Sequence, residues 1–441
     1  MKSKTISKIQ VDTFSIPLSS MKMSNKTRGK NTLIRTLGIT ALAILILAGV
    51  AGAAPFAYVT SMGVDTGTVF VIDTETNNLT AVVPVGGWPA GVAVNPAGTK
   101  VYVATAGFST NTFCVIDTST NTVSVTVDVG DHPHGVTVNP TGSRVYVTNR
   151  YSVVDNDSNN ISVIDTSTNT LMTPVNVGLS TYNVAVTPDG KKIYATNSRN
   201  NTTSVIDAAT NKVTGFVAVG HHPTDIAVSP DGNNIYVTNA GSNNVSVIDA
   251  ATNKVTATVP VGDSPCDIAI SPDGKKAYVP NSRSNSISVI DTTTNIVTAI
   301  VPVGITPLGV AITPDGTKVY VTNAESDNVS VIDTVTNTVT ATVNAGKYHI
   351  IHPTGVAIEP FKESIKATSI ATENTGVEET NLSSSEEENA VGLNNSKINN
   401  SESDNVSSSN GNESSKNNST PGFGLLGSLT CLYGGWKLRK K

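Results

Sequence analysis

Hydrophobic and polar residues alternate in short runs through the middle of the chain. The runs "VSVI" at 245–248 and "VTATV" at 255–259 place an apolar side chain at every second position. This period of two is typical of half-buried β-strands. Gly, Asn and Asp separate the runs, as in "PDG" at 230–232, and these residues favour tight turns. The pattern predicts an all-β structure made of short strands.

Three short motifs recur seven times in this region. The motif "YVT" and its variants begin at Tyr58 and return every 42 to 48 residues, the last time at Tyr320. The "VID" and "GVAV" motifs recur with a similar period. A period in the low forties made of strands indicates a β-propeller. Each repeat predicts four strands, A to D, which in the repeat at 225–262 read "DIAVSP", "NIYVTN", "NVSVID" and "KVTATVPVG".

The order of the motifs predicts how the ring closes. The chain starts with strands B, C and D of one blade and ends with a single strand A, "GVAIEP", at 355–360. We therefore expect a seven-bladed β-propeller of four-stranded antiparallel blades over residues 54–361, closed by pairing the C-terminal strand A with the N-terminal strands B–D. Such blades place the D–A and B–C loops on one rim and the A–B and C–D turns on the other.

The coincident motifs resemble those of the YVTN-repeat seven-bladed propellers found in archaeal surface-layer proteins. The resemblance spans residues 56–360. It implies a propeller on the outside of the cell.

The N-terminal residues 1–53 are predicted to be a secretory signal. Basic residues at 26–35 precede an apolar run at 37–50, and "AGA" at 51–53 offers an A-x-A cleavage site. A retained membrane anchor is the alternative, although the run is shorter than the ~20 residues that span a bilayer. Translation could also begin at Met21 or Met23.

The C-terminal part predicts a stalk and an anchor. Residues 362–420 are rich in Ser, Asn, Glu and Thr, a composition that buries little and stays disordered. On an exported chain its N-x-S/T sequons are candidates for glycosylation: Asn381, Asn394, Asn399, Asn405, Asn412, Asn417 and Asn418. Residues 421–441 resemble the PGF-CTERM sorting signals of archaeal surface proteins, which are cut and replaced by a lipid anchor. A simple membrane-associating tail is the alternative.

Charge and cysteine content narrow the class of partner. The net charge is −5, and the acidic charge lies in the body of the chain while both ends are basic. This distribution does not suit nucleic acid. The three cysteines show no metal-type spacing, and disulfides are not expected to hold the fold. We expect no cofactor, and partners among cell-envelope proteins or glycans.

Candidate binding residues gather in the D–A loops of one rim. All six histidines of the chain lie there: His132, His134, His221, His222, His349 and His352. The same loops contain Trp88, Tyr182, Cys266, Asp225 and Asp267. The histidines that precede a proline could in principle hold a transition metal. The alternative is that "HP" only forms a turn into strand A, so the metal question stays open.

The aspartates of the seven "VID" motifs have a structural explanation. A group present in every blade usually belongs to the blade, and Asp accepts hydrogen bonds from the turn that follows it. We expect this turn role for Asp73, Asp117, Asp165, Asp207, Asp249, Asp291 and Asp333.

Function should depend on the parts in which the blades differ. Length changes fall in the loops at 61–68, 105–112, 149–160 and 346–354, all on the histidine-bearing rim. The sequence therefore predicts an exported, surface-anchored propeller that acts as a non-catalytic binding or structural module of the cell envelope, monomeric or associated in a lattice. A propeller hydrolase or lyase that uses the rim histidines and acids is the alternative, although the sequence contains no nucleophile motif.

Overall fold

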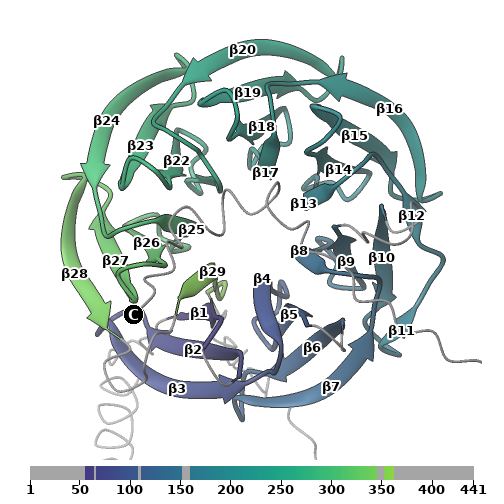
Figure 1. Cartoon of the computed structure of the whole chain (residues 1–441), viewed down its shortest axis with the longest axis horizontal. Helices are drawn as coiled ribbons and strands as arrows, with labels where there is room; N and C mark the ends of the chain where they lie inside the picture. The colour runs from purple at the N-terminus through teal and green to yellow at the C-terminus, as the bar shows by residue number, and fades with distance from the viewer. Residues whose placement is uncertain (1–54, 64–65, 108–110, 151–158, 345–351, 362–441) are drawn as a thin grey trace, which may run out of the picture. The chain divides into compact units, whose positions relative to one another are not determined.

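A computed structural model describes residues 55–63, 66–107, 111–150, 159–344 and 352–361. In these residues 29 strands form seven sheets, arranged as blades around a central axis (Figure 1). The predicted all-β seven-bladed propeller with four-stranded antiparallel blades is confirmed. The described residues contain no helix that is long and apolar enough to span a membrane. The predicted signal, stalk, glycosylation sites and sorting tail lie outside the described residues.

The blades are numbered here in chain order. Blade 1 contains β4 (Trp88–Val94), β5 (Lys100–Ala106), β6 (Thr112–Asp117) and β7 (Thr122–Asp128). Blade 2 contains β8 (Pro133–Val138), β9 (Arg144–Asn149), β10 (Asn160–Asp165), β11 (Thr170–Leu171) and β12 (Val175–Asn176). Blade 3 contains β13 (Thr181–Val186), β14 (Lys192–Asn197), β15 (Thr202–Asp207) and β16 (Lys212–Ala218). Blade 4 contains β17 (Pro223–Val228), β18 (Asn234–Asn239), β19 (Asn244–Asp249) and β20 (Lys254–Pro260).

The three remaining blades complete the ring. Blade 5 contains β21 (Ala269–Ile270), β22 (Lys276–Asn281), β23 (Ser286–Asp291) and β24 (Ile296–Pro302). Blade 6 contains β25 (Pro307–Ile312), β26 (Lys318–Asn323), β27 (Asn328–Asp333) and β28 (Thr338–Asn344). Blade 7 joins β29 (Pro353–Ile358) to β1 (Phe56–Ser61), β2 (Thr68–Asp73) and β3 (Asn78–Pro84).

Blade 7 closes the ring as the order of motifs predicted. Strand β29 pairs antiparallel with β1, with Tyr58 opposite Ala357. Next to this pair, the amide of Glu359 donates to the carbonyl of Phe56 at 2.9 Å, and the hydroxyl of Tyr58 donates to Glu359 Oε1 at 2.9 Å. Glu359 is only 1% exposed. Both ends of the ring therefore meet at one rim, joined by a buried carboxylate.

The hydrophobic core lies between the blades. The cluster between blades 4 and 5 combines Tyr236, Val247 and Val259 with Ile268 and Val279, and six further clusters repeat this arrangement around the ring. The tyrosine of every "YVT" motif is almost completely buried. Because each cluster needs two blades, no blade has a core of its own.

The rim with the A–B and C–D turns is called here the turn rim, and its repeated residues hold neighbouring blades together. In the C–D turn of blade 4, Asp249 Oδ1 accepts hydrogen bonds from the amide and hydroxyl of Thr252 at 2.7 and 2.6 Å. Asn253 follows with a φ of 54°, a left-handed conformation that Asn tolerates well. Its Oδ1 accepts a 2.8 Å hydrogen bond from Tyr194 of blade 3. The motif "D-x-x-T-N" thus forms a turn and also receives the tyrosine of the preceding blade.

The opposite rim, called here the variable rim, is built around the asparagine that ends strand B. Asn323 is fully buried, and its Nδ2 donates to Asn328 Oδ1 and to Ser330 Oγ, both at 2.9 Å. The D–A loop crosses directly over it, so that a Cβ at Gly304 would lie 2.6 Å from Asn323 Cγ. The same glycine–asparagine contact recurs at the entrances to blades 2, 3, 4 and 5. The asparagine that ends "YVTN" therefore requires the glycine that ends "VG", because a larger residue there would collide with its side chain.

Two blades depart from the expected four continuous strands, in both cases at a proline. The outer strand of blade 2 is divided into β11 and β12 around Pro174, which has no N–H to donate to a ladder. In blade 5, Pro280 replaces the threonine of "YVTN", and the inner strand β21 is reduced to two residues. Blade 5 is therefore the irregular member at the axis.

Candidate functional site

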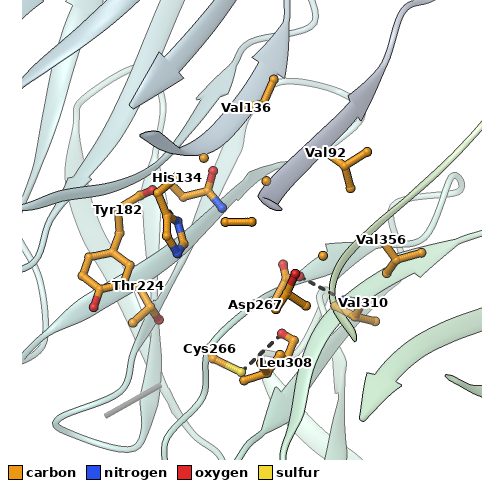
Figure 2. A pocket seen from close by; sticks show the side chains of 16 residues that line it. Val92, His134, Val136, Tyr182, Thr224, Cys266, Asp267, Leu308, Val310 and Val356 are labelled. Carbon is orange, nitrogen blue, oxygen red and sulfur yellow. Dashed lines mark hydrogen bonds between the residues drawn. The ribbon is translucent and has the colours of Figure 1, made fainter. Parts of the chain in front are cut away.

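The strands A of all seven blades begin at the variable rim and surround an axial cavity of about 180 Å³ (Figure 2). The cavity is lined mainly by the first three positions that follow the proline, or its equivalent, at the start of each strand A. It is described below as the axial mouth. The walls of the axial mouth therefore consist largely of positions at which the side chain differs from blade to blade.

A belt of threonine hydroxyls forms the frame of the axial mouth. Thr148 Oγ1 accepts the amide of Gly135 at 2.8 Å and donates to the carbonyl of Tyr182 in blade 3 at 2.8 Å. Thr322 repeats this arrangement between blades 6 and 7. In blade 5, where Pro280 has no hydroxyl, the thiol of Cys266 lies 3.3 Å from the carbonyl of Leu308 and takes over the contact to the next blade. Cys266 thus has a structural role at the wall.

One position of strand A separates the blades into two groups. Blades 1, 2, 6 and 7 have glycine there, and the neighbouring inner strand packs directly against it; a Cβ at Gly355 would lie 2.6 Å from the carbonyl oxygen of Ala90. The three adjacent blades 3, 4 and 5 have Asn183, Asp225 and Asp267 instead. The axial mouth therefore has a polar side at these three blades, where Asn183 and Asp267 line the cavity.

These three side chains are connected to one another. Asn183 Nδ2 donates to Asp225 Oδ1, and Asp225 Oδ2 accepts the amide of Ile268 at 2.8 Å. Asp267 Oδ2 accepts the amide of Val310 at 2.9 Å. A hydrogen bond also joins the two carboxyl groups. The chain of contacts runs from blade 3 to blade 6 along the inner strands.

Burial and a neighbouring charge keep the carboxyl group of Asp225 protonated. Asp225 is 5% exposed, and burial raises its pKa well above the ordinary value; the negative charge of Asp267 and the hydrogen bond between them act in the same direction. Asp225 therefore stays neutral at pH values at which surface aspartates are ionised. Of the two residues, Asp267 is the one that lines the cavity.

We expect Asp225→Asn to gain stability relative to the wild type as the pH rises from 4 to 8. Because the folded-state pKa of Asp225 lies above the unfolded value of 3.8, the folded protein binds more protons than the unfolded chain in this range, and wild-type stability falls with pH. Asparagine does not titrate, so the variant lacks this pH-dependent loss of stability. The difference in Tm between variant and wild type, followed by circular dichroism, should increase with pH.

Asp231→Asn is the matched control. Hydrogen bonds from Ser229 and Asn233 lower the pKa of Asp231, so its contribution is present above 3.8 and is lost as the pH falls below that value. The difference in Tm between Asp231→Asn and the wild type should stay nearly constant between pH 4 and 8. A constant difference for Asp225→Asn as well would contradict the raised pKa of Asp225.

A second polar group lies beside the carboxyl pair. His134 Nδ1 donates to the carbonyl of Tyr182 at 3.1 Å, which leaves Nε2 as an acceptor. Burial and the charge of Arg150 lower the pKa of His134 to about 3, so its imidazole is neutral. The Tyr182 ring contacts His134 and His222 edge-on, and the guanidinium of Arg150 stacks on it at 3.6 Å. Burial, with the charge of Arg150, also lowers the pKa of His222.

The structure places the predicted rim residues in different surroundings. His134, Tyr182 and Asp267 line the axial mouth, and Asp225 lies directly behind Asp267. The other described rim residues are not part of its lining: Trp88, His132, His221, His222 and His352. His349 lies outside the described residues.

The histidines before a proline serve the backbone. His132, His222 and His352 have φ values of 49°, 54° and 35°, and Ser and Thr occupy the same left-handed position in the three blades without histidine or tryptophan. In the described part of the chain no group of three or more His, Cys, Asp or Glu side chains is placed to hold a metal ion. This geometry favours the turn interpretation of "HP" over a shared metal site.

Sequence reasoning missed the contributions of Asn183, Arg150 and Pro280. Asn183 could have been found by superposing the repeats, because it occupies the position of Asp225 and Asp267. The stacking of Arg150 on Tyr182 has no signal in the repeat, since Arg150 lies at the start of the variable loop 149–160.

Two family descriptions match parts of the ring. One is the YNCE-like β-propeller, over residues 179–279, and the other is the seven-bladed β-propeller lactonase, over residues 249–358. The chain is similar to YNCE-like and lactonase propellers. The lactonase match includes Asp267 of the axial mouth, and the YNCE-like match includes the whole polar side. No curated protein matches the chain.

Solved structures agree on the architecture. Hydrazine synthase of Kuenenia stuttgartiensis is 25% identical, with 60% of this chain and 89% of that chain covered and a TM-score of 0.55. A functionally unknown protein of Desulfotomaculum acetoxidans is 18% identical, covering 69% and 99%, with a TM-score of 0.60. A candidate 6-phosphogluconolactonase of Bacteroides fragilis is 18% identical, covering 70% and 99%, with a TM-score of 0.57. The latter two likenesses concern the fold alone.

Proposed function

We propose that this chain is an exported propeller, held at the cell surface, that binds a partner of the cell envelope through its variable rim without catalysis. The observation that carries the proposal is the division of the ring into two unequal rims. The turn rim repeats the same contacts from blade to blade, whereas side chains and loop lengths differ around the axial mouth. A surface that need not repeat can be adapted to a partner.

The ends of the chain support the location. The signal-like segment before residue 54 directs export, and the predicted stalk and sorting tail hold the protein outside. Strand β29 delivers the chain to the turn rim, so a stalk that begins after Phe361 leaves the variable rim directed outward. Cell fractionation tests this location, and protein recovered soluble in the cytoplasm would contradict it.

Changes on the variable rim should weaken partner binding without loss of stability. We expect the double variant His132→Asn and His222→Asn to bind surface-stripped cells about 5- to 30-fold more weakly, the effect of losing one or two interface residues worth 1–2 kcal/mol. Asparagine is chosen because it tolerates the left-handed backbone at both positions. Binding of labelled full-length protein is measured by flow cytometry, and Tm by circular dichroism.

The matched control changes the turn rim. The side chains of Lys191 and Lys275 are 81% and 76% exposed, and their replacement by alanine should leave binding and Tm unchanged. If these lysine variants lose binding and the histidine variants keep it, the partner uses the opposite face.

Hydrolysis of a lactone is the second candidate function, and the carboxyl pair favours it. A carboxyl group with a raised pKa, Asp225, beside a second carboxyl group, Asp267, is an arrangement suited to acid and base catalysis, and the lactonase match includes Asp267. A screen of lactones and esters with wild type, Asp225→Asn and Asp267→Asn tests it. Turnover that disappears in both variants would establish the enzyme; no turnover by the wild type would exclude it for the substrates tested.

A further inference from the structure

The axial mouth has an unequal supply of hydrogen-bonding groups. Its threonine hydroxyls are used inside the protein: the hydroxyl of Thr224 donates to the carbonyl of Pro265 at 3.0 Å, and the hydroxyl of Thr354 to that of Pro89 at 3.0 Å. Asn183 donates to Asp225. Two further lining residues offer acceptors, namely the carboxylate of Asp267 and Nε2 of His134.

The charge in the axial mouth has one sign. Asp267 is the charged side chain among the lining residues, and no lysine or arginine is among them. His134 adds no positive charge, because its imidazole stays neutral. The guanidinium of Arg150 stacks on the Tyr182 ring, and Arg150 is not among the residues that line the cavity.

The wall beside the polar side is apolar. Val92, Val136, Val310 and Val356 line the cavity from blades 1, 2, 6 and 7, and Leu308 lies next to Cys266 (Figure 2). A ligand that fills the axial mouth therefore needs a hydrogen-bond donor with positive charge at one end and a short hydrocarbon body at the other.

We propose that the axial mouth binds a small aliphatic primary amine, whose ammonium group donates to the Asp267 carboxylate and whose alkyl chain lies against the valines of blades 1, 2, 6 and 7. This assignment rests on the proposed binding function and names the ligand class for its central cavity. An ammonium has three donors and no acceptor, which is the complement of the groups exposed there. Because Asp267 is partly buried, a charge-assisted hydrogen bond adds more there than on the open surface.

The carboxyl pair makes the site selective. Burial and the negative charge of Asp267 raise the pKa of Asp225, so the charge that a ligand meets in the cavity is that of Asp267. A carboxylate ligand would face this charge directly, and an alcohol would bring a donor without charge. Amines should therefore bind more tightly than alcohols or acids of equal chain length.

Calorimetry with the full chain and three probes of equal length tests the proposal. n-Butylammonium should bind at least about tenfold more tightly than n-butanol, since a charged hydrogen bond exceeds a neutral one by about that factor. n-Butyrate should give no detectable heat. Equal affinity for butanol or butyrate, or no binding of butylammonium, would overturn the assignment.

Three variants locate the binding in the axial mouth. Asp267→Asn should lower the affinity for butylammonium by about tenfold or more. Asp263→Asn is the matched control, because Asp263 is an exposed acid of the same D–A loop outside the lining, and it should keep the wild-type affinity. Ala90→Leu, which narrows the cavity from the apolar side without touching a charge, should also weaken binding even if Asp267→Asn folds poorly.

The outcomes separate this proposal from the one on which it rests. Butylammonium binding that survives both Asp267→Asn and Ala90→Leu would place the amine elsewhere and overturn the proposal. If cells bind the wild-type protein through its variable rim but butylammonium does not bind, the proposed amine site is wrong and the envelope-binding function stands. If butylammonium binds and the histidine variants still attach to cells, the amine site stands and the rim function falls.

Discussion

Ending the chain before Pro353, so that β29 is missing, should abolish cooperative folding of the ring. The truncation removes the partner of β1, the buried Val356 and the carboxylate that accepts from Tyr58. It also leaves the cluster between blades 6 and 7 open to water. Domains are stable by only about 5–15 kcal/mol in total, and losing an inner strand together with this burial removes a comparable amount. Thermal melts by circular dichroism and size-exclusion chromatography measure the effect.

Two further chains make this result specific. A chain that ends after Phe361 keeps every contact of the ring described above and should melt within a few degrees of the full-length protein. A synthetic peptide of residues 353–361, added to the truncated chain, should restore a cooperative transition by completing blade 7. An unchanged melting curve for the chain without β29 would show that the ring does not depend on its closure.

The second large effect is expected for Asn323→Ala, at about 2–4 kcal/mol of destabilisation. The amide of Asn323 is fully buried and donates to the half-buried Asn328 and the buried Ser330, so its removal leaves these acceptors without their donor and opens a small cavity. Urea unfolding followed by fluorescence or circular dichroism gives the change in free energy.

Glu325→Ala is the control for this variant. Glu325 is exposed and lies two residues after Asn323, and its replacement should change stability by no more than ~0.5 kcal/mol. In a double-mutant cycle, Gly304→Ala should cost less in the Asn323→Ala background, because the added Cβ lies 2.6 Å from the Cγ that is then missing. Independent, additive effects of the two changes would contradict the contact.

The fold could be predicted from the sequence because its information is repeated. Each strand is specified by a motif that occurs in almost every blade, so irregular residues in one blade do not hide the pattern. The closure of blade 7 followed from the order of the motifs, and the pairing of β29 with β1 confirms it. Only local irregularities were missed, at Pro174 and Pro280, where a missing N–H interrupts a ladder that the repeat otherwise predicts.

The site was harder to predict because it depends on contacts between blades. The sequence drew attention to Asp225 and Asp267 as members of similar loops, 42 residues apart. Their hydrogen bond, and the burial that keeps one of them neutral, arise only when two inner strands converge at the axis. The histidines drew attention by their number, yet the residue type before the proline is limited mainly by the left-handed backbone. The histidines, which were the most conspicuous residues of the D–A loops, are thus turn formers. The polar wall is instead indicated by the position of strand A at which aspartate replaces the glycine of other blades.

The closure of blade 7 also sets a time order for folding. The hydrogen bond between Tyr58 and Glu359 joins residues 301 positions apart, whereas the other blades are made from segments of about forty residues. Blades 1 to 6 can form one after another as the chain emerges, but blade 7 has to wait until the last strand is available. Contacts of such long range slow folding because most of the chain must be ordered before they can form. Until then β1 presents an unpaired inner edge to any other strand in its neighbourhood. An exported chain would carry this edge through the whole of its translocation, and the final nine residues of the ring decide when the risk of aggregation ends.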